Sequence, residues 1–328
     1  MWGDNSHGQL GLGTTTNSDI PLQLNSLTGV IAISGGYYHS LALKSDGTVW
    51  AWGMNDHGQL GDSTTVERDI PVQVAGLNGV SAISAGDWHS LALKSDGTVW
   101  AWGANDSGQL GNGTTNQSLI PLQVTSLTGI SSVAAGGRNS LALGLNGAVW
   151  GWGLNDNGEL GNNTTTDSAI PVAVSLPSGI IAIGIRDQHS LALRSDGTVW
   201  SWGWNGYGQV GNGTTSNSNL PIQLSGINGA VVINAGVYDS LAISAAPTIT
   251  LFNPGINGLS VSINGVTLPS VAGASIKEIT WNWGDGQKIA GWFPQSHNYS
   301  QVGTYNIVVT ATDTNGQSQS ASVVVTIK

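Results

Sequence analysis

Three histidines, each followed by a serine, are the residues in this sequence whose types most readily suggest chemistry. They are His39, His89 and His189, and they occupy one position of a repeated unit. A His-Ser pair could supply a general base and a nucleophile, and a ring of histidines could ligate a metal. The same position holds Asn139 and Asp239 in two other copies, so the property common to all copies is hydrogen bonding. We therefore interpret the position as a structural tie from loop to backbone.

The remaining motifs that could bind a ligand or take part in catalysis are interpreted as turns. Asp285 lies in Trp-Gly-Asp-Gly, and the segment Asp313-Thr-Asn-Gly has alternating oxygen ligands but is too short for a calcium loop. Gly11-x-Gly13 lacks the following helix and lysine that a phosphate-binding loop needs. No zinc-protease motif or nucleophile elbow is present. The sequence therefore predicts a protein that is not an enzyme and that needs no cofactor and no metal.

A unit of 50 residues occurs five times and must position any functional residue. Trp2-Gly3 returns at the same spacing as Trp52, Trp102, Trp152 and Trp202, each followed by glycine. Further positions recur four more times in step, namely those of Gly8, Gly11, Pro21, Gly29 and Ser40. A supersecondary unit copied at this period is typical of a propeller or a solenoid, in which each copy buries its faces against its neighbours.

Each unit is predicted to contain four β-strands and no helix. In the second copy the segments 81–84, 89–94 and 98–103 are apolar or alternating, and a fourth short strand passes through Pro121. Asp96-Gly97 between two of these runs is a strong hairpin signal, because a type I′ turn needs positive φ at both positions. The periodic tryptophans are predicted to lie in the core. Four strands are the size of a propeller blade, so the fold class is all-β with a β-propeller over residues 1–245.

The repeat resembles that of the regulator of chromosome condensation family. The resemblance rests on Trp-Gly-x-Asn-x-x-Gly-Gln-Leu-Gly, Pro-x-x-Val, Ala-Gly-x-x-His-Ser-Leu-Ala-Leu and Asp-Gly-x-Val, which recur through residues 1 to about 245. It implies a β-propeller. It does not imply nucleotide exchange or chromatin binding, because this repeat occurs in many unrelated proteins, including secreted bacterial inhibitors of β-lactamase.

The two ends of the repeat region are each incomplete. Met1-Trp2-Gly3 begins in the middle of a strand with no signal peptide before it, and the fifth copy loses the pattern after Ser244. We expect the two ends to pair and to close a ring of five blades. Family members often have seven blades, so an N-terminal truncation is one alternative. Donation of the strand between chains, with self-association, is the other.

Residues 246–328 are predicted to form a second β domain, because the period stops while β-rich runs continue. The segments Trp281-Asn-Trp-Gly-Asp-Gly, His297-Asn-Tyr, Gly303-Thr-Tyr and Ala311-Thr-Asp resemble the polycystic-kidney-disease (PKD) domain. This resemblance implies a small immunoglobulin-like β-sandwich. Such domains are common spacers or interaction modules in extracellular and cell-surface proteins.

Composition limits the classes of partner and compartment. Only 9% of the 328 residues are charged, the net charge is −10, and cysteine is absent. The acidic balance argues against binding nucleic acid or an anionic membrane surface, and no run is long and apolar enough to insert into a bilayer. Disulfides and thiolate chemistry are excluded. Low charge, no cysteine and the PKD-like domain together indicate an extracellular or cell-surface protein.

The candidate binding face is predicted from the positions at which the copies differ. Two variable loops, one before the His-Ser position and one after Trp-Gly, carry the large side chains that interfaces favour. The candidate residues are Tyr37, Tyr38, His57, Asp87, Trp88, Arg138, Gln188, Trp204, Tyr207 and Tyr238. A further variable stretch, Thr16–Asp19 and its copies, is polar and is interpreted as solvated loop.

Three functions remain open. The favoured one is a recognition module whose propeller face binds a protein or glycan on a cell or particle surface, with the PKD-like domain as spacer or anchor. The second is a structural subunit of an extracellular assembly such as a surface layer, a filament or a virion decoration. The third, an enzyme inhibitor or an exchange factor, rests on fold analogy alone.

Overall fold

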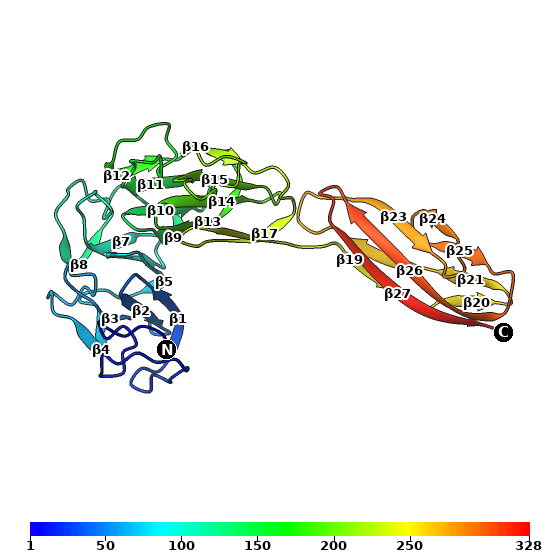
Figure 1. The fold of residues 1–328 in the computed structure, drawn as a ribbon, viewed down its shortest axis with the longest axis horizontal. Coiled ribbons are helices and arrows are strands. Elements are labelled where there is room, and N and C mark those ends of the chain that lie inside the picture. The colour runs from blue at the N-terminus through cyan, green and yellow to red at the C-terminus, as the bar shows by residue number, and fades with distance from the viewer. The chain divides into compact units, whose positions relative to one another are not determined.

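The computed structural model describes residues 1–328, which form strands, turns and loops but no helix. It divides into two compact units (Figure 1). The first comprises Met1–Arg194, Trp200–Ser225 and Ile233–Leu241, and the second comprises Ser195–Val199, Gly226–Val232 and Ala242–Lys328. No helix is long and apolar enough to cross a membrane.

The repeats fold into four-stranded antiparallel sheets, the blades of the propeller. The first blade is β1 (Val30–Gly35), β2 (His39–Lys44), β3 (Val49–Gly53) and β4 (Arg68–Gln73), paired in chain order. The predicted hairpin joins β2 and β3, but its turn is not of type I′, because Gly47 has a positive φ of 78° whereas Asp46 does not. The Asp46 carboxylate instead accepts a hydrogen bond from the Thr48 amide at 3.0 Å, and the Gly47 amide donates to the Lys44 carbonyl at 2.9 Å.

Three further blades repeat this order along the chain (Figure 1). Their strands are β5 (Val80–Ala85), β6 (His89–Lys94), β7 (Val99–Gly103) and β8 (Ser118–Gln123); β9 (Ile130–Ala135), β10 (Asn139–Gly144), β11 (Val149–Gly153) and β12 (Ser168–Ala173); β13 (Ile180–Arg186), β14 (His189–Arg194), β15 (Val199–Gly203) and β16 (Ser218–Gln223).

A shared carbonyl joins each blade to the next. The Gln59 carbonyl, in the loop between β3 and β4, accepts hydrogen bonds from the Trp102 indole at 2.9 Å and from the Ser90 hydroxyl at 2.8 Å. The same arrangement recurs at Gln9, Gln109 and Glu159. The indole lies so close to the loop that a Cβ on Gly61 would be 2.8 Å from Trp102 Nε1. Glycine is therefore required there for packing as well as for its φ of +65°.

The three His-Ser positions also join neighbouring blades. His39 Nε2 lies 3.0 Å from the Ser90 hydroxyl of the next blade, and His89 and His189 repeat this contact with Ser140 and Ser240. Because each serine donates its proton to the shared carbonyl, the histidine must donate from Nε2 and leave Nδ1 bare. The tie therefore runs from side chain to side chain between blades, whereas the sequence predicted a tie from loop to backbone.

Burial keeps these histidines neutral. It lowers the pKa of His39 to about 3, with smaller contributions from His89 and Arg186, and lowers the pKa of His89 to about 4. Asn139, which replaces histidine in the third blade, is buried too, and its side-chain amide has no hydrogen-bond partner.

The two ends of the repeat region form half blades. β17 (Ala230–Ala235) and β18 (Ser240–Ser244) make a two-stranded sheet. The N-terminal segment pairs only with its own continuation, since Gly3 and Ser18 exchange both backbone hydrogen bonds and the Leu22 amide donates to the Met1 carbonyl.

The predicted pairing of the two ends is therefore wrong for this structure, which holds four complete blades and two half blades. Met1–Gly3 pairs with the segment 18–22, and β18 pairs with β17 in a sheet of two strands, so each half blade is paired with its own neighbouring segment and not with the other half blade.

The C-terminal domain is a β-sandwich. One sheet has the order β24 (Lys288–Ala290), β23 (Ile276–Asn282), β26 (Gly303–Asp313) and β27 (Ser318–Ile327). The others pair β20 (Gly255–Asn257), β21 (Ser260–Ile263) and β25 (Gln295–Asn298), and β19 (Thr248–Leu251) with β22 (Gly265–Leu268).

Aromatic side chains fill the core of this sandwich. Trp281 and Trp283 stack with ring centroids 5.2 Å apart, and the Tyr299 hydroxyl donates to the Trp283 carbonyl at 2.8 Å. Asp285 and Asp313 accept hydrogen bonds from backbone amides two residues further along, as residues of turns do.

The glycine that faces the indole yields a stability prediction with an internal control. We expect Gly111→Ala to destabilise the protein by about 2 kcal/mol more than Gly211→Ala. Both glycines have positive φ, +68° and +74°, but a Cβ at Gly111 would lie 2.8 Å from Trp152 Nε1, whereas at Gly211 the nearest atoms are Leu224 methyls at 3.6 Å. Urea-induced unfolding measures the difference, and equal losses would show that the indole contact imposes no constraint.

The buried histidines yield a pH prediction. Below about pH 6.5 the unfolded chain binds a proton at His39, whereas the folded chain stays neutral until the pH nears its pKa of about 3. The free energy of unfolding should therefore fall on acidification by up to about 1.4 kcal/mol per pH unit for each such histidine. Urea-induced unfolding from pH 7 to pH 4.5 should show a shallower fall in His39→Asn, since asparagine is accommodated at Asn139. Parallel slopes in the two proteins would contradict neutral burial.

Candidate functional site

The two variable loops of each blade emerge at the same end of its sheet. β2 begins at His39, which pairs with Gly53 at the end of β3, so the turn before β2 and the loop after β3 lie side by side. The Met54 amide donates to the Tyr38 carbonyl at 2.9 Å, and the equivalent bond joins the loops of the next three blades. Residues that are distant in the sequence are thereby gathered on one face, the loop face.

A buried polar frame holds the loop that follows β3. Asn55 accepts a hydrogen bond from the Leu60 amide at 3.0 Å and donates to the carbonyls of Thr64 and Val66. The Gln59 side chain accepts from the His57 amide at 2.9 Å. Because Asn55 and Gln59 are buried and hydrogen-bond to the backbone of their own loop, they hold the loop in a fixed geometry, in which its outward residues are presented.

The first aromatic cluster comprises His7, Tyr37, Tyr38, His57 and Trp88. The ring centroids of Tyr37 and Tyr38 lie 4.5 Å apart, and Trp88 lies 5.7 Å from Tyr37 and 5.7 Å from His57. His7 adds a ring contact with Tyr38 at 4.7 Å. The cluster therefore draws on four loop segments and leaves Tyr37 55% exposed.

The second aromatic cluster comprises Trp204, Tyr207 and Tyr238. Its three ring-centroid distances are between 5.1 and 5.9 Å, and all three pairs meet edge to face. Tyr207 and Tyr238 are 71% and 56% exposed. Exposed rings that already contact one another have little freedom to lose when a ligand binds.

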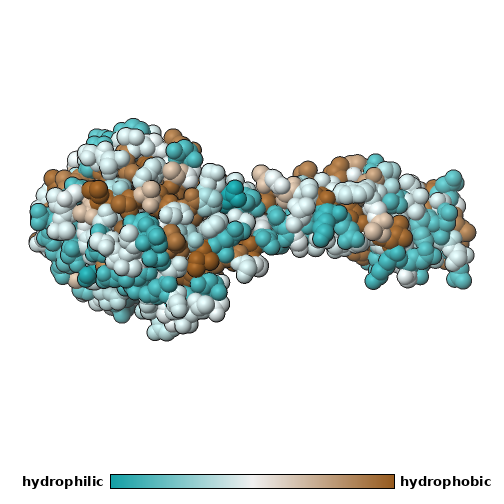
Figure 2. All heavy atoms as spheres, turned by 90° about the horizontal axis from the view of Figure 1, so that it is seen from above, coloured by the Kyte–Doolittle hydropathy of each residue, from teal (hydrophilic) through white to brown (hydrophobic).

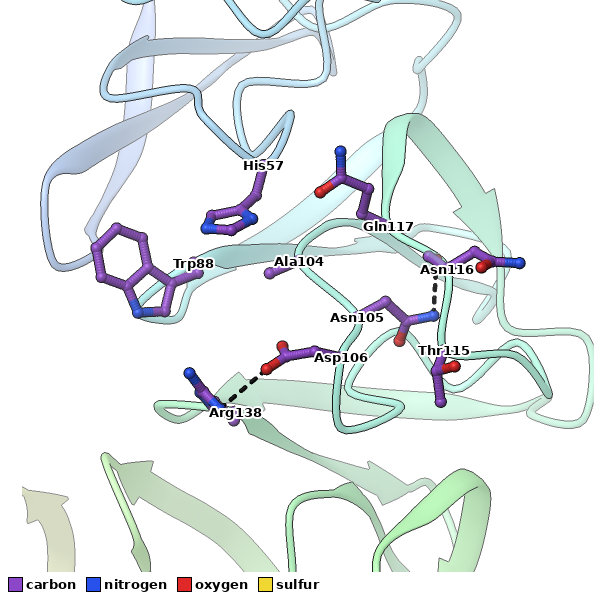
Figure 3. A pocket seen from close by; sticks show the side chains of 9 residues that line it. All are labelled: His57, Trp88, Ala104, Asn105, Asp106, Thr115, Asn116, Gln117 and Arg138. Atoms are coloured by element: carbon purple, nitrogen blue, oxygen red, sulfur yellow. Dashed lines mark hydrogen bonds and ion pairs between the residues drawn. The ribbon is translucent and has the colours of Figure 1, made fainter.

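A pocket of about 570 Å³ opens beside the first cluster (Figure 3). His57 and Trp88 border it on one side, and the Arg138–Asp106 ion pair, with a nitrogen–oxygen distance of 2.9 Å, borders it on another. Asn116 and Gln117 add exposed amide side chains. The pocket thus combines an aromatic wall with hydrogen-bonding groups, and its one cation is already paired with an anion.

Two of the predicted residues lie in polar networks instead. Asp87 and Asp187 flank Gly137, and burial raises the pKa of Asp87 to about 6 although Arg186 opposes this shift. Gln188 accepts a hydrogen bond from Asn157 at 3.0 Å, and Asn157 accepts one from Asn217 at 2.8 Å. Neither residue belongs to an aromatic cluster or to the pocket.

The structure thus brings together eight of the ten predicted residues in the two clusters and the pocket. Asp106, Asn116 and Gln117 were missed, as was the place of His7 in the first cluster. The stretch interpreted as solvated loop is exposed at Asn116 and Gln117, as predicted, and these two residues also line the pocket. The available signal was that this stretch also varies between copies.

On the face seen in Figure 2, apolar side chains lie among polar ones. The His-Ser pairs do not reach the surface, because His39, His89 and His189 are each at most 1% exposed. No group of three or more His, Asp or Glu side chains is arranged to hold a metal ion. The loop face therefore offers stacking and hydrogen bonding to a ligand.

Comparison with known proteins agrees with this architecture. The model of the regulator of chromosome condensation (RCC1) repeat matches residues 1–43, 46–93, 96–143, 146–193 and 196–243, and the PKD domain model matches residues 245–327. Human WBSCR16 is 25% identical, with a TM-score of 0.66 over 75% of this chain and 67% of that chain. Prp20p of Saccharomyces cerevisiae is 21% identical, with a TM-score of 0.53 over 80% of each chain. The protein therefore belongs to the RCC1 repeat family and carries a C-terminal PKD domain.

Proposed function

We propose that this protein is a non-enzymatic recognition module whose loop face binds a partner protein. The observation that carries the proposal is the gathering of exposed tyrosine, tryptophan and arginine side chains on loops that a buried frame holds rigid. These residue types dominate binding energy at protein interfaces. Their entropic cost on binding is small because the rings are already packed together.

Related propellers support a protein partner. Prp20p has binding properties toward Gsp1p and histones, and a structure of Kap60 bound to yeast Prp20 is known. The loop face of this protein carries the two aromatic clusters, and the whole chain has a net charge of −10. We therefore propose a protein partner recognised by aromatic packing, and not a nucleic acid, whose phosphates would need a basic patch on this protein.

The proposed setting is extracellular or at a cell surface, with the PKD domain as spacer or anchor. The PKD domain itself, the low content of charged residues and the absence of cysteine support this setting. Exposed hydroxyl pairs line the long hairpin of that domain, as in the contact of Thr310 with Ser320 at 2.7 Å.

A glycan is the second candidate ligand, and the pocket beside Trp88 favours it. An indole face can pack on a sugar ring, while Asp106, Asn116 and Gln117 can hydrogen-bond to its hydroxyls. Because Arg138 is paired with Asp106, the pocket suits a neutral sugar better than an acidic one.

A pair of variants tests the proposed face. We expect the double variant Tyr37→Ala/Trp88→Ala to weaken binding to a surface-protein extract by about tenfold or more, because it removes two anchors of one cluster. Leu145→Ala is the matched control, since Leu145 is 80% exposed in the turn between β10 and β11, at the other end of the blade from the loop face. Quantitative pull-down followed by titration with the captured protein provides the measurement.

A glycan array with the same variants separates the two ligands. Binding of a neutral glycan that is lost in Trp88→Ala and weakened in Asp106→Asn would favour the second candidate. Partner binding that survives both the double variant and Tyr207→Ala/Tyr238→Ala would contradict the proposed loop face.

A further inference from the structure

The third blade contains a second pocket, at the end of the blade opposite the loop face. It has a volume of about 280 Å³ and lies between the hairpin that joins β10 to β11 and the segment that follows β12. The lining includes Trp150 of β11 together with Asn146, Ala148, Leu176, Pro177 and Ser178. The pocket is thus built within one complete blade.

The chain itself covers the equivalent indole in the second blade. Lys94 Nζ lies 5.6 Å from the ring centroid of Trp100, and Trp100 Nε1 donates a hydrogen bond to the Thr98 hydroxyl at 3.2 Å. The first blade repeats both contacts, at 5.8 and 3.4 Å. Each of these indoles therefore has an ammonium group beside its ring and an acceptor for its N–H group.

The third blade lacks all of these groups at once. The replacements are Gly144 for Lys94, Asn146 for Asp96 and Ala148 for Thr98. A Cβ at Gly144 would lie 2.9 Å from Trp150 Cζ3, so the indole lies directly against the backbone there. Because the methyl group of Ala148 cannot accept a hydrogen bond, this side chain leaves Nε1 of Trp150 available to another acceptor. The cation and its neighbouring anion are both replaced, so the pocket carries no charged side chain.

The segment after β12 also departs from the other copies. Leu77 and Leu127 are at most 3% exposed at the position where the third copy has Pro177. The leucine of the third copy stands one residue earlier, at Leu176, where it is half-buried against the core. The third copy therefore brings a half-buried leucine and a proline to the pocket in place of one buried leucine.

This lining suits a neutral ligand that has an apolar face and a hydrogen-bonding edge. The indole of Trp150, with Leu176 and Pro177, supplies apolar surface, while Ser178 supplies a hydroxyl. The Asn146 side-chain oxygen accepts from the Ala148 amide at 3.1 Å, so its amino group is the part left to donate. A pyranose matches these groups, because its C–H face packs on an indole and its hydroxyl oxygens accept hydrogen bonds. The volume lies just below the range of about 300 Å³ and more that drug-sized ligands need, so it holds a single ring.

We propose that this pocket of the third blade binds one neutral pyranose residue of a glycan, stacked on Trp150. The indole is held in place because it packs against the core cluster that includes Leu91 and Ala142, so it loses little freedom on binding. The third copy differs from its neighbours in this respect, since Lys44, Lys94 and Arg194 supply a cation at the position of Gly144. The site does not depend on the function proposed for the loop face.

Saturation-transfer NMR of the full chain tests the proposal with four neutral probes, the methyl glycosides of glucose, galactose, mannose and N-acetylglucosamine. Ring protons of at least one glycoside should receive saturation from the protein. Asn146→Asp/Ala148→Thr should weaken its binding about fivefold or more, because Nε1 of Trp150 then has an acceptor within the chain. These two residues are those of the second copy, so the fold should tolerate them.

The matched control makes the reverse change in the second blade. Asp96→Asn/Thr98→Ala should bind the glycoside as the wild type does, because Lys94 still lies beside Trp100. Circular dichroism checks that both double variants are folded.

A further variant separates this pocket from the one on the loop face. Binding that persists in Trp88→Ala and falls in Asn146→Asp/Ala148→Thr supports the proposal. Binding that is lost in Trp88→Ala would assign the glycoside to the loop face and overturn it. No signal from any of the four glycosides, equal binding by the two double variants, or a response to N-acetylprolinamide alone would also overturn it.

Discussion

One backbone carbonyl in each of the first four repeats, accepting two hydrogen bonds from the next blade, is the interaction on which the repeat region depends. At Gln59 it receives the Trp102 indole and the Ser90 hydroxyl, and the same serine accepts from His39. These groups are buried, so an unmade bond would leave a polar atom without a partner at a substantial cost. The tryptophan therefore fixes both the distance between blades and their relative orientation.

The buried frame separates the structural from the variable part of each loop. Asn55 and Gln59 use their side chains on the loop's own backbone, so the residues between them are free to differ between copies. His57 and Tyr207 from this segment join the aromatic clusters and Asp106 lines the pocket, and the turns before β2, β6 and β18 supply further rings. Binding chemistry can thus change at the surface while the contacts that hold the blades remain the same.

The strands and hairpins of the blades could be predicted from the sequence because their signals are local. Alternating apolar residues and Asp-Gly turns specify β2 and β3 within a few residues of one another. The ties between blades could not be predicted, because a histidine at position 39 does not reveal that its partner is Ser90. The predicted ring closure was wrong for a related reason: the repeat pattern identifies the strands at the two ends but does not specify whether they pair with each other.

The candidate site also contains residues that could be predicted from the sequence and residues that could not. Tyr37, Trp88 and Tyr238 could be found because large aromatic residues are unexpected in a turn between core strands. Asn116 and Gln117 resemble ordinary solvated residues, and only their place beside Arg138 and Trp88 in the fold makes them part of a pocket. Polar residues of a shallow pocket carry no signal that distinguishes them from loop residues in a chain rich in asparagine and threonine.

The tryptophan of each blade packs on a glycine in the preceding loop, as Trp102 does on Gly61, and this contact couples each repeat to its immediate neighbour. Each of the four junctions has the same tryptophan packed on the same glycine, so this contact contributes to the stability of the array as a sum over neighbouring pairs. Duplication or deletion of one 50-residue copy would preserve the tryptophan–glycine contact at the remaining junctions. Gene-level slippage by whole units is therefore structurally tolerated, and it would lengthen or shorten the binding face in steps of one pair of loops.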